Sequence, residues 1–530
     1  MLGSFRKSLV KFTTKPIDLA IALVSGCLMG MTFAPVGAWY LAWVALAPLW
    51  YLLCRNGSRG RVLYPLCWGV GCYGLGLVWI VGIHPMTWMG VPFLPSLIFV
   101  TFCLIFITLW GTSLAVVWSL VMGFINTKLK LNPLVRVILA TAVWCCLENF
   151  YSLSNLWWTS LALSQSPHNL SIIHLGQLSG PTMVSGSIVA INGLIAEGCL
   201  ALELGKTQLA HKVRPALPYL TTAIVLLISL HSIGYTLANR ELIEPPASAL
   251  KVGIIQGNIG NDVKVYQSAN RLAIENYTQG YTHLADQGVD VVITPETALP
   301  FSESQIKTTP FYQAILAKRV PAFVGAFGVA HSRLTNSMLN IDRDGEIVSR
   351  YDKAKLVPLG EYIPFEEVVG KLAEQIVPFD SRLVPGKFGA VTMTPFGNIM
   401  FGICYDSAYA EHFRLQAQTG GLIISAANDT HYTAAMPAQH HAQDIMRAVE
   451  TDRWLVRASN TGYSAVIDPH GRTRWISELH EFTTHVDRVY RRSTQTLYVR
   501  FGDWFTPLLL VVGLGLFVGG KITSRNLWGL

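Results

Sequence analysis

The most constraining feature of the chain is the regular spacing of long apolar runs along its first 240 residues. Most of these runs approach the roughly 20 residues that a helix needs to cross a hydrocarbon core. An eighth run, 504–518, lies near the C-terminus. The pattern predicts an α-helical membrane bundle of about eight transmembrane helices, the first seven near 17–34, 38–54, 62–83, 92–123, 134–151, 180–203 and 216–237.

The loops between the runs alternate in charge. The N-terminus and the second, fourth and sixth loops contain lysine or arginine, whereas the first, third and fifth contain neither. Because basic loops stay on the cytoplasmic side of a membrane, the pattern predicts cytoplasmic N- and C-termini and an external segment at 240–500. The first run could instead be a cleaved signal peptide, but six further runs follow it and it has no clear small-residue cleavage site.

Charge is distributed unevenly between the two halves. Residues 1–250 carry 14 Lys and Arg against 6 Asp and Glu, whereas residues 251–520 carry 24 against 26. Only 14% of the chain is charged, compared with about 25% in ordinary soluble domains. These values exclude a disordered chain, argue against a wholly soluble one, and do not describe a nucleic-acid binder.

Residues 250–490 have a different pattern, in which short β-rich runs alternate with helical segments such as 265–287 and 440–452. This alternation is typical of an α/β fold. Segments 342–345 and 468–471 have the composition of tight hairpin turns. We therefore expect a mixed, two-sheet domain with strands near 251–255, 289–293, 322–327, 337–341, 390–392, 399–403, 422–425, 454–458 and 464–467.

Three domains follow from these patterns. Residues 1–240 form the predicted membrane domain with seven transmembrane helices, and 241–500 form the extracytoplasmic domain. Residues 501–530 contain the last transmembrane helix and a short cytoplasmic tail.

Cysteine usage singles out one residue. Eight of the nine cysteines lie in or beside apolar runs, and only Cys404 lies in the external domain, where it has no disulfide partner. It follows the apolar strand 399–403, and a strand end can project a nucleophile into a cleft. A buried structural cysteine is the alternative.

Two further residues can complete a site for acyl transfer. A thiol nucleophile needs a base and a group that stabilises an oxyanion. Glu296 follows the predicted strand 289–293 and Lys353 lies in the segment 351–362. Taken singly, such a glutamate is more often a cap, and the lysine a surface charge. Lys355 competes for the lysine role, because residues two apart in an extended segment share a face.

Together these residues resemble a known family. Pro295-Glu296, Tyr351-Asp-Lys-Ala-Lys-Leu356 and Gly402-Ile-Cys-Tyr-Asp406 follow the order of the nitrilase superfamily triad. Seven predicted spans before and one after resemble the apolipoprotein N-acyltransferases, as do Leu356-Val-Pro-Leu-Gly-Glu-Tyr-Ile-Pro364 and Arg457-Ala-Ser-Asn-Thr-Gly462. The resemblance covers essentially the whole chain and implies an αββα sandwich of nitrilase-like type.

The resemblance also implies roles for individual residues. Cys404 would be the nucleophile, Glu296 the base, and Lys353, with the backbone N–H of Tyr405, the oxyanion-stabilising group. Glu361 would orient Lys353 or belong to a lid, and Asp406 would support the site. No metal and no organic cofactor is implied.

The implied activity is acyl transfer in lipoprotein biosynthesis. A phospholipid, expected to be phosphatidylethanolamine, would leave its acyl chain on Cys404 as a thioester. The α-amine of the N-terminal diacylglyceryl-cysteine of an apolipoprotein would then accept it. The protein would be multi-pass in a bacterial inner membrane, with the catalytic domain on the periplasmic face.

Some positions depart from the family pattern. Val265 stands near a usual tryptophan, Asp406 stands where the family usually has a glutamate, and His431-Tyr432 stands where it usually has Trp-Phe. Apolar surface for a lid or an acyl-chain groove is expected at 356–365, at 368–376 and at Trp157-Trp158, with ordinary core packing as the alternative.

Two alternatives remain at this point, a membrane-tethered amidase that uses water as acceptor and a non-catalytic lipoprotein-binding relative. The pair His440-His441 is interpreted as two helix-surface histidines rather than metal ligands, because adjacent rings on a helix diverge by about 100°. His431, near Asn428-Asp429, is a better candidate for a pocket residue, although a plain loop histidine is the favoured interpretation. Glu148 and Glu197 are costly inside a membrane and are expected at wet helix ends or in the substrate cleft.

Overall fold

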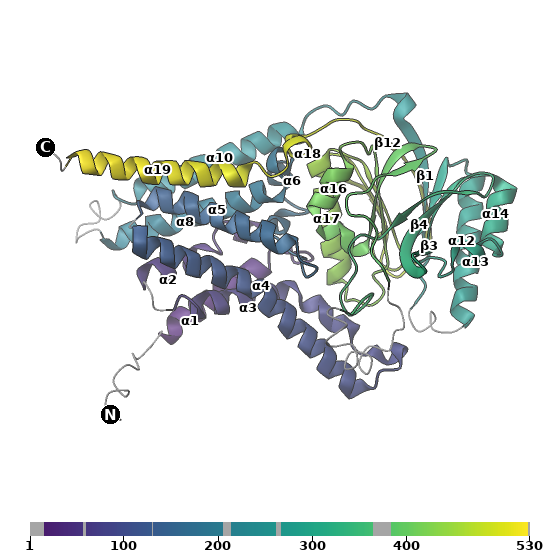
Figure 1. Cartoon of the computed structure of the whole chain (residues 1–530), viewed down its shortest axis with the longest axis horizontal. Helices are drawn as coiled ribbons and strands as arrows, with labels where there is room; N and C mark the ends of the chain where they lie inside the picture. Colours follow the sequence, from purple (N-terminus) through teal and green to yellow (C-terminus); the bar gives the residue numbers. More distant parts are fainter. Residues whose placement is uncertain are drawn as a thin grey trace.

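The computed structural model describes residues 15–56, 60–129, 131–204, 214–260, 267–363 and 383–527. The first half of the chain forms a domain of helices, and the segment from 249 to 490 forms an α/β domain beside it (Figure 1). The last helix returns along the helical domain, so that the two ends of the described chain lie at the end remote from the α/β domain.

The helical domain consists of long apolar helices joined by short turns. Short helices α6 (Leu170–Ile173) and α7 (Gly176–Ser179) and 3-10 turns η1 (Trp39–Trp43), η2 (Val78–Ile83), η3 (Met86–Met89) and η4 (Leu161–Gln165) lie between them. The longer helices are α1 (Pro16–Gly30), α2 (Ala47–Arg55), α3 (Leu63–Gly76), α4 (Phe93–Leu129), α5 (Pro133–Ser152), α8 (Pro181–Leu204), α10 (Leu217–Ala238) and α19 (Phe505–Leu527).

Within the described residues, four helices are long and apolar enough to cross a membrane: α4, α5, α8 and α10. α1 and the Phe505–Gly519 part of α19 are shorter apolar helices. The predicted count of eight spans is therefore not confirmed. The predicted span 38–54 is η1 followed by the nine-residue α2, and 62–83 is the 14-residue α3 followed by η2.

A contact from another helix explains why the apolar segment 38–54 is not one helix. Asn192 of α8 accepts hydrogen bonds from the backbone N–H groups of Leu46 and Ala47 at 2.9 and 2.8 Å, and its side-chain amide donates to the carbonyl of Ala42. Irregular backbone is tolerated at membrane depth where protein groups satisfy it. Apolar composition alone does not reveal such a partner.

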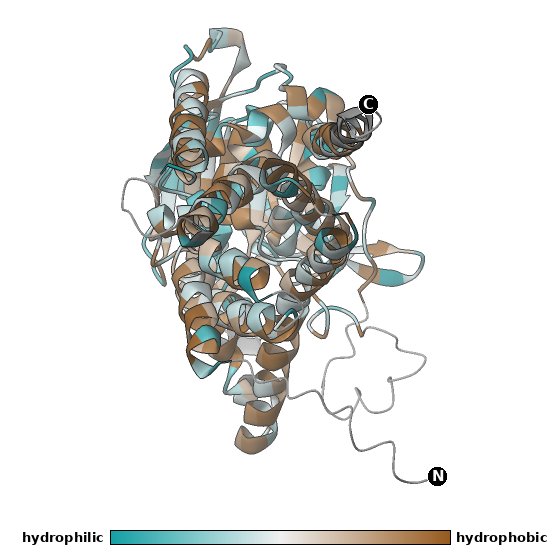
Figure 2. Cartoon of the chain, turned by 90° about the vertical axis from the view of Figure 1, so that its left-hand side faces the viewer, coloured by the Kyte–Doolittle hydropathy of each residue, from teal (hydrophilic) through white to brown (hydrophobic). Residues whose placement is uncertain are grey.

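The outer surface of the helical domain is apolar. Seen end-on, much of the ribbon of its helices has the brown colour of hydrophobic residues (Figure 2). Large exposed apolar residues recur on α4, α10 and α19, among them Ile98, Phe102, Phe106, Ile224, Ile228, Val511 and Leu514. A surface of this kind faces lipid rather than water, which supports a membrane location.

Glu148 and Glu197 lie inside the bundle rather than at wet helix ends. Glu197 pairs with Arg136, whose Nε lies 2.7 Å from its carboxylate, and both Trp144 Nε1 and the N–H of Leu161 donate to Glu148. Charged groups at membrane depth are stable when paired or hydrogen-bonded in this way. The expectation of wet helix ends was wrong, whereas Glu148 does line a large cavity described below.

The α/β domain contains two six-stranded sheets. Their orders are β12-β1-β2-β3-β4-β5 and β11-β10-β9-β8-β7-β6, each with parallel pairs at its centre and antiparallel strands toward its edges. The strands are β1 (Ala249–Gln256), β2 (Val291–Ile293), β3 (Ala322–Ala330), β4 (Arg333–Ile341), β5 (Ile347–Asp352), β6 (Thr392–Thr394), β7 (Gly397–Ile403), β8 (Ile423–Ala427), β9 (Leu455–Ser459), β10 (Ala465–Ile467), β11 (Thr473–Ile476) and β12 (Thr483–Tyr490).

Helices cover both outer faces of the sheet pair. In Figure 1, α12 (Gln267–Asp286), α13 (Glu303–Ile306) and α14 (Pro310–Lys318) lie on the outer side, and α16 (Ala410–Gln416) and α17 (Ala435–Thr451) lie on the side of the helical domain. The predicted αββα arrangement is confirmed. The hairpin turns expected at 342–345 and 468–471 connect antiparallel pairs β4–β5 and β10–β11. Strands β5, β11 and β12 were not anticipated.

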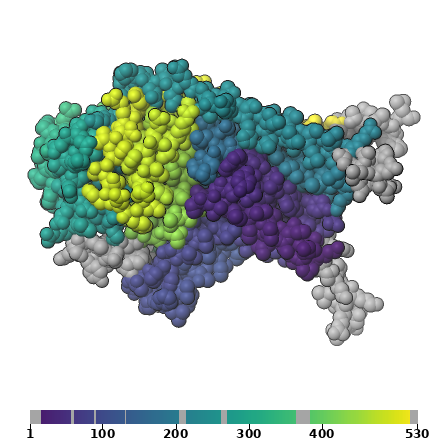
Figure 3. Space-filling view, turned by 180° about the vertical axis from the view of Figure 1, so that it is seen from behind, coloured from purple at the N-terminus to yellow at the C-terminus, as the bar shows by residue number. Residues whose placement is uncertain are grey.

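The two domains are in direct contact, as the space-filling view from behind shows (Figure 3). Gln439 of α17 makes the densest set of polar contacts across the boundary. Its carbonyl oxygen accepts from Trp79 Nε1 at 3.2 Å and Trp158 Nε1 at 2.8 Å, and its amide donates to the carbonyls of Ala34 and Gly76. The boundary thus falls on the side of the predicted loops that lack lysine and arginine.

We expect Gln439→Leu to weaken the attachment of the two domains. Leucine fills a similar volume but leaves two indole N–H groups and two carbonyls without these partners, which should cost about 2–4 kcal/mol of stability. Thermal unfolding in detergent, followed by tryptophan fluorescence, measures the loss. Gln418→Leu, on the exposed surface, is the matched control, and equal stability of the two variants would contradict the role of Gln439.

Candidate active site

Cys404 lies at a sharp turn between a strand and a helix. β7 ends at Ile403, and the 3-10 turn η6 (Cys404–Ala408) begins at the cysteine itself. Cys404 has a φ of +49°, which is unusual for a residue with a side chain and marks a strained backbone. This backbone turns the residue out of the plane of the sheet. The thiol is held in a buried site, with 6% of the residue exposed.

Glu296 and Lys353 form a buried ion pair. Glu296 follows β2 and Lys353 follows β5, so both lie just past strand ends in the same sheet. The distance from Lys353 Nζ to Glu296 Oε1 is 3.0 Å, and the lysine is 1% exposed. An ammonium group is buried so deeply only when carboxylates compensate its charge.

Glu361 provides the second carboxylate, with Lys353 Nζ 2.9 Å from its Oε2. The side-chain amide of Asn336 donates to both acids, to Glu296 Oε1 at 2.7 Å and Glu361 Oε1 at 2.9 Å. The N–H of Val357 also donates to Glu361. Asn336, which the sequence analysis did not single out, therefore holds the two acids in a fixed relation to the lysine.

The electrostatic environment determines the protonation of the lysine and the cysteine. Burial works against the charged form of Lys353, but Glu296 and Glu361 outweigh it and raise its pKa well above the ordinary value. Burial, reinforced by Glu296 and opposed by Lys353, raises the pKa of the Cys404 thiol well above its ordinary value. Near neutral pH the site therefore holds an ammonium and a protonated thiol, and the thiol requires a base to react.

The competing lysine, Lys355, points elsewhere. Its Nζ donates to Asn155 Oδ1 at 3.1 Å and lies 4.5 Å from the centre of the Tyr409 ring. Lys353, not Lys355, is the lysine that contacts Glu296. The spacing in the sequence could not distinguish the two lysines. The path of the chain beyond β5 determines which of them reaches Glu296.

Asp406 ties the cysteine turn to the lysine segment. Its Oδ2 accepts from the N–H of Ile403 at 2.9 Å and from the hydroxyl of Tyr351 at 2.8 Å, and its Oδ1 accepts from the N–H of Lys355 at 2.8 Å. The side chain is completely buried. Through these contacts, Asp406 holds the backbone on both sides of the site in place.

Tyr405 anchors the turn to the helical domain. Its hydroxyl donates to the carbonyl of Asn155 at 2.9 Å, and its ring stacks on Trp158 with the ring centres 6.1 Å apart. Burial raises the pKa of its hydroxyl. The hydroxyl is thus a structural donor, which leaves the backbone N–H as the group of Tyr405 that the resemblance assigns to an oxyanion.

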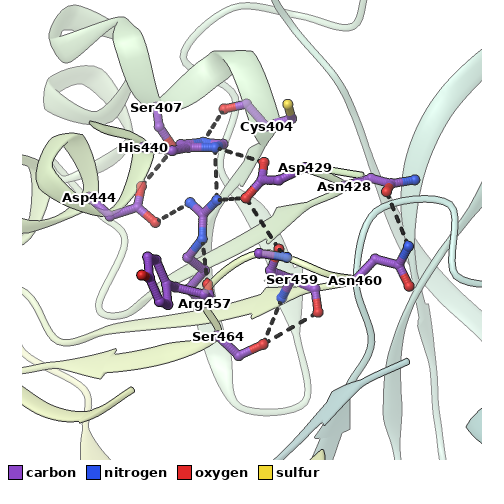
Figure 4. A network of polar contacts seen from close by, with 12 residues as sticks. Cys404, Ser407, Asn428, Asp429, His440, Asp444, Arg457, Ser459, Asn460 and Ser464 are labelled. Carbon is purple, nitrogen blue, oxygen red and sulfur yellow. Dashed lines mark hydrogen bonds and ion pairs between the residues drawn. The ribbon is translucent and has the colours of Figure 1, made fainter. Parts of the chain in front are cut away.

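His440 is buried beside the cysteine, so its interpretation as a helix-surface residue was wrong (Figure 4). α17 lies between a sheet and the helical domain, and both faces of its middle turns are covered. Arg457 Nη2 lies 2.7 Å from His440 Nδ1, and because arginine can only donate, Nδ1 accepts and Nε2–H donates to the carbonyl of Cys404 at 2.9 Å. His441 is also buried, and burial lowers its pKa to about 4.

Arg457 is the cation of this second cluster. It pairs with Asp429 at 3.0 Å and Asp444 at 2.9 Å, and these side chains are completely buried. Burial raises the pKa of Asp429, but the charge of Arg457 outweighs it and lowers the pKa to about 2. Donor atoms of Cys404, Asp429 and His440 lie within 4.8 Å of one another, a spacing suited to a metal ion. In this structure, however, the guanidinium is the cation that Asp429 and His440 bind.

A cavity of about 890 Å³ lies at the boundary of the two domains. Trp157, Trp158, Lys355 and Tyr409 are among its lining residues, together with Glu148 from the helical domain. Cys404 is not part of the lining, but Trp158, which is, stacks on the neighbouring Tyr405. The cavity therefore ends beside the cysteine turn.

Several positions named in the sequence analysis remain. Tyr432 packs edge-on against Trp79, with ring centres 5.1 Å apart, and its neighbour His431 is not among the residues that line the cavity. Val265 and the segment 368–376 lie outside the described residues, as does the end of 356–365.

Asn336 was not predicted as a site residue, and His440 was interpreted wrongly. Asn336 stands between Thr335 and Ser337 in a buried part of β4, and a buried polar run of this kind is a weak sign of a polar role. The local sequence gave no sign that His440 is buried, because its burial results from the packing of α17 between the sheet and the helical domain.

A two-sheet α/β domain with a buried Glu–Lys–Cys cluster, joined to a domain of apolar helices, defines a membrane-bound enzyme of the carbon–nitrogen hydrolase class. Residues 251–493 match the family described as Carbon-nitrogen hydrolase, and residues 25–194 match the Apolipoprotein N-acyltransferase N-terminal domain. The chain belongs to the apolipoprotein N-acyltransferase family.

Two bacterial relatives agree with this assignment. The apolipoprotein N-acyltransferase of Nostoc sp. is 49% identical over 93% of this chain and 97% of its own length. That of Synechocystis sp. is 42% identical over 91% and 97%. Among solved structures, Saccharomyces cerevisiae Nit3, a member of branch 10 of the nitrilase superfamily, aligns with 48% of this chain and 94% of its own, at 15% identity and a TM-score of 0.36.

We expect Cys404 to react slowly with iodoacetamide at pH 8. A raised pKa means that the thiol stays protonated below that pKa and ionises only as the pH rises through it, and burial adds a steric barrier. Peptide mapping by mass spectrometry should show alkylation at least about tenfold slower than for an exposed cysteine of ordinary pKa. The same peptide in denatured protein is the control. Equal rates would mean that Cys404 is an exposed thiolate.

Asp406→Asn should destabilise the site at nearly constant volume. An amide has one acceptor oxygen, so its NH2 group must face at least one of the donors that Asp406 now binds, which should cost about 2–3 kcal/mol. Denaturant unfolding in detergent measures the change. Asp344→Asn, in an exposed surface ion pair, should change stability by less than about 1 kcal/mol. An equally small effect at position 406 would show that the contacts of Asp406 are not needed for stability.

Proposed function

We propose that the protein transfers a fatty acyl chain from a membrane phospholipid to the α-amine of the N-terminal diacylglyceryl-cysteine of apolipoproteins, through a thioester on Cys404. The observation that carries the proposal is the position of Cys404, on a strained turn beside the buried Glu296–Lys353–Glu361 cluster and at the end of a cavity shared with the apolar helical domain.

In the first half-reaction, Cys404 Sγ attacks an ester carbonyl of the phospholipid, and Glu296 takes the thiol proton. The developing oxyanion is stabilised by the ammonium of Lys353 and the backbone N–H of Tyr405. Collapse of the tetrahedral intermediate breaks the ester C–O bond, and Glu296 returns its proton to the leaving oxygen. A lysophospholipid departs and a thioester remains.

In the second half-reaction, the α-amine of the lipidated cysteine attacks the thioester carbonyl. Glu296 again acts as base, and the same donors stabilise the oxyanion. The C–S bond breaks, an amide forms, and the thiol of Cys404 is regenerated. Glu361 and Asn336 keep Lys353 and Glu296 in place throughout, which agrees with their contacts.

The location of the cavity supports an amphiphilic substrate. Its walls combine apolar side chains of both domains, including Trp157 and Trp158, with polar groups. Both substrates are anchored in a bilayer, so their head groups must enter from the membrane surface. Phosphatidylethanolamine is the proposed donor.

We place the protein in a bacterial inner membrane, as a multi-pass protein with the α/β domain on the periplasmic face and both termini in the cytoplasm. The basic loops of the sequence support this orientation, and so does the packing of the uncharged loops against α17. The proposed domains are 1–240, 241–500 and 501–530. These bounds agree with the end of α10 at Ala238 and the start of α19 at Phe505.

The decisive experiment is the intact mass of the purified protein after incubation with phosphatidylethanolamine, with Cys404→Ser as the matched variant. We expect a thioester-linked acyl adduct on the wild type, absent from the variant. A diacylated cysteine peptide added afterwards should remove the adduct and gain an amide-linked acyl chain. The overall rate of the variant should fall at least about a thousandfold, as expected for loss of a nucleophile.

Other outcomes would replace the proposal. Release of free fatty acid, with no acylated peptide, would identify a hydrolase that uses water as acceptor. Failure of any phospholipid to form an adduct on the wild type would favour a non-catalytic lipoprotein-binding protein.

A further inference from the structure

A half-buried cation lines the cavity but takes no part in the proposed chemistry. The ammonium of Lys355 lies over two aromatic rings, 4.5 Å from the centre of Tyr409 and 5.5 Å from that of Phe388, and donates to Asn155. The aromatic faces and a neutral amide hold the charge in place but do not neutralise it. The side chain is thus a positioned positive charge facing a cavity.

The backbone of Lys355 is fixed close to the nucleophile. One carboxylate, that of Asp406, accepts from the N–H of Lys355 at 2.8 Å and from the N–H of Ile403, the residue before Cys404, at 2.9 Å. The segment that carries Lys355 therefore lies beside the cysteine turn, and its side chain lines the cavity that ends there. A cation in this cavity is accessible to a group on the same glycerol unit as the reacting ester.

The acidic residues that line the cavity are already bound by other donors. Glu411 pairs with Arg414 at 2.5 Å, and Glu148 accepts from the N–H of Leu161 at 2.8 Å. Asp503 accepts from the hydroxyl of Ser179 at 3.0 Å and from the side-chain amide of Asn149. Two further cations, Arg333 and Arg447, line the cavity, and Arg447 pairs with Glu450 at 2.9 Å. Among the described residues no carboxylate forms an ion pair with Lys355, so its ammonium can attract an anionic ligand group.

We propose that Lys355 binds the phosphodiester of the donor phospholipid and thereby distinguishes the donor from the acceptor; this inference rests on the proposed acyl transfer. Lysine binds phosphate as a point charge, and a partly desolvated site strengthens the attraction.

The need for such a contact follows from the chemistry of the two substrates. Both bring a glycerol unit with fatty acyl esters to the same thiol. The donor carries a phosphodiester on that glycerol, whereas the diacylglyceryl-cysteine carries a thioether and no phosphate. A phosphate-binding lysine acts in the first half-reaction and has no partner on the acceptor in the second.

The test separates the two half-reactions in Lys355→Met, which keeps an unbranched side chain over the rings but removes the charge. Thioester formation is measured with limiting phosphatidylethanolamine, and discharge is measured with a diacylated cysteine peptide. We expect the ratio of the first rate to the second to fall at least about tenfold relative to the wild type, as for loss of one charge-assisted contact. Lys355→Arg should restore most of the ratio.

Two controls test whether Lys355→Met acts only by disturbing the structure. Lys318→Met, on the outer helix α14 and in a surface ion pair, should behave as the wild type. A p-nitrophenyl fatty acyl ester, which has no phosphate, reports on Cys404 directly. In Lys355→Met, the rate with phosphatidylethanolamine should fall at least about tenfold relative to the rate with this ester.

Several outcomes would overturn the inference. An unchanged rate with phosphatidylethanolamine would show that Lys355 does not bind the donor. Equal losses with the p-nitrophenyl ester and the phospholipid would assign it a general positioning role. Inhibition of the wild type by millimolar inorganic phosphate with both donors, relieved in Lys355→Met, would indicate a free-anion site instead. If the wild type forms no adduct at all, the proposed function fails, which is a different result.

Discussion

The site depends on one buried charge, the ammonium of Lys353. Removing an ammonium from water is expensive unless carboxylates and hydrogen bonds compensate it. Here Glu296 and Glu361 lie within 3.0 Å of it, and Asn336 joins the two acids. The segments that follow β2 and β5 must therefore meet at one end of a sheet, and this convergence places the base and the cation beside the cysteine turn. Loss of either acid would leave a buried charge uncompensated.

The helix α17 connects this chemistry to the membrane domain. Its consecutive residues Gln439 and His440 face different partners. Gln439 contacts Trp79 and Trp158 of the helical domain, whereas His440 donates to the carbonyl of Cys404 and is held by Arg457. The geometry of Cys404 is thus tied to the packing between domains. A cavity lined by both domains ends at the same place, so this cavity belongs to neither domain alone.

Much of the architecture could be predicted because it has local signals. Apolar runs marked the helical domain, and alternating strands and helices marked the two-sheet domain. The number of spans was less predictable, because Asn192 satisfies the backbone of a segment that composition alone assigns to a continuous helix. Strands at sheet edges, such as β11 and β12, lacked a clear apolar pattern because much of their surface is not buried.

The sequence by itself determined the family and predicted the three groups of the proposed site, since Glu296, Lys353 and Cys404 stand in motifs whose order can be read along the chain. It also determined the apolar character of the helical domain. Only the tertiary structure decided which of Lys353 and Lys355 meets Glu296, and that His440 is buried beside the nucleophile. The reason is physical. A motif or a hydrophobic period is formed by residues that are close together in the sequence, whereas the burial, the pairing and the pKa of a side chain depend on segments tens to hundreds of residues away.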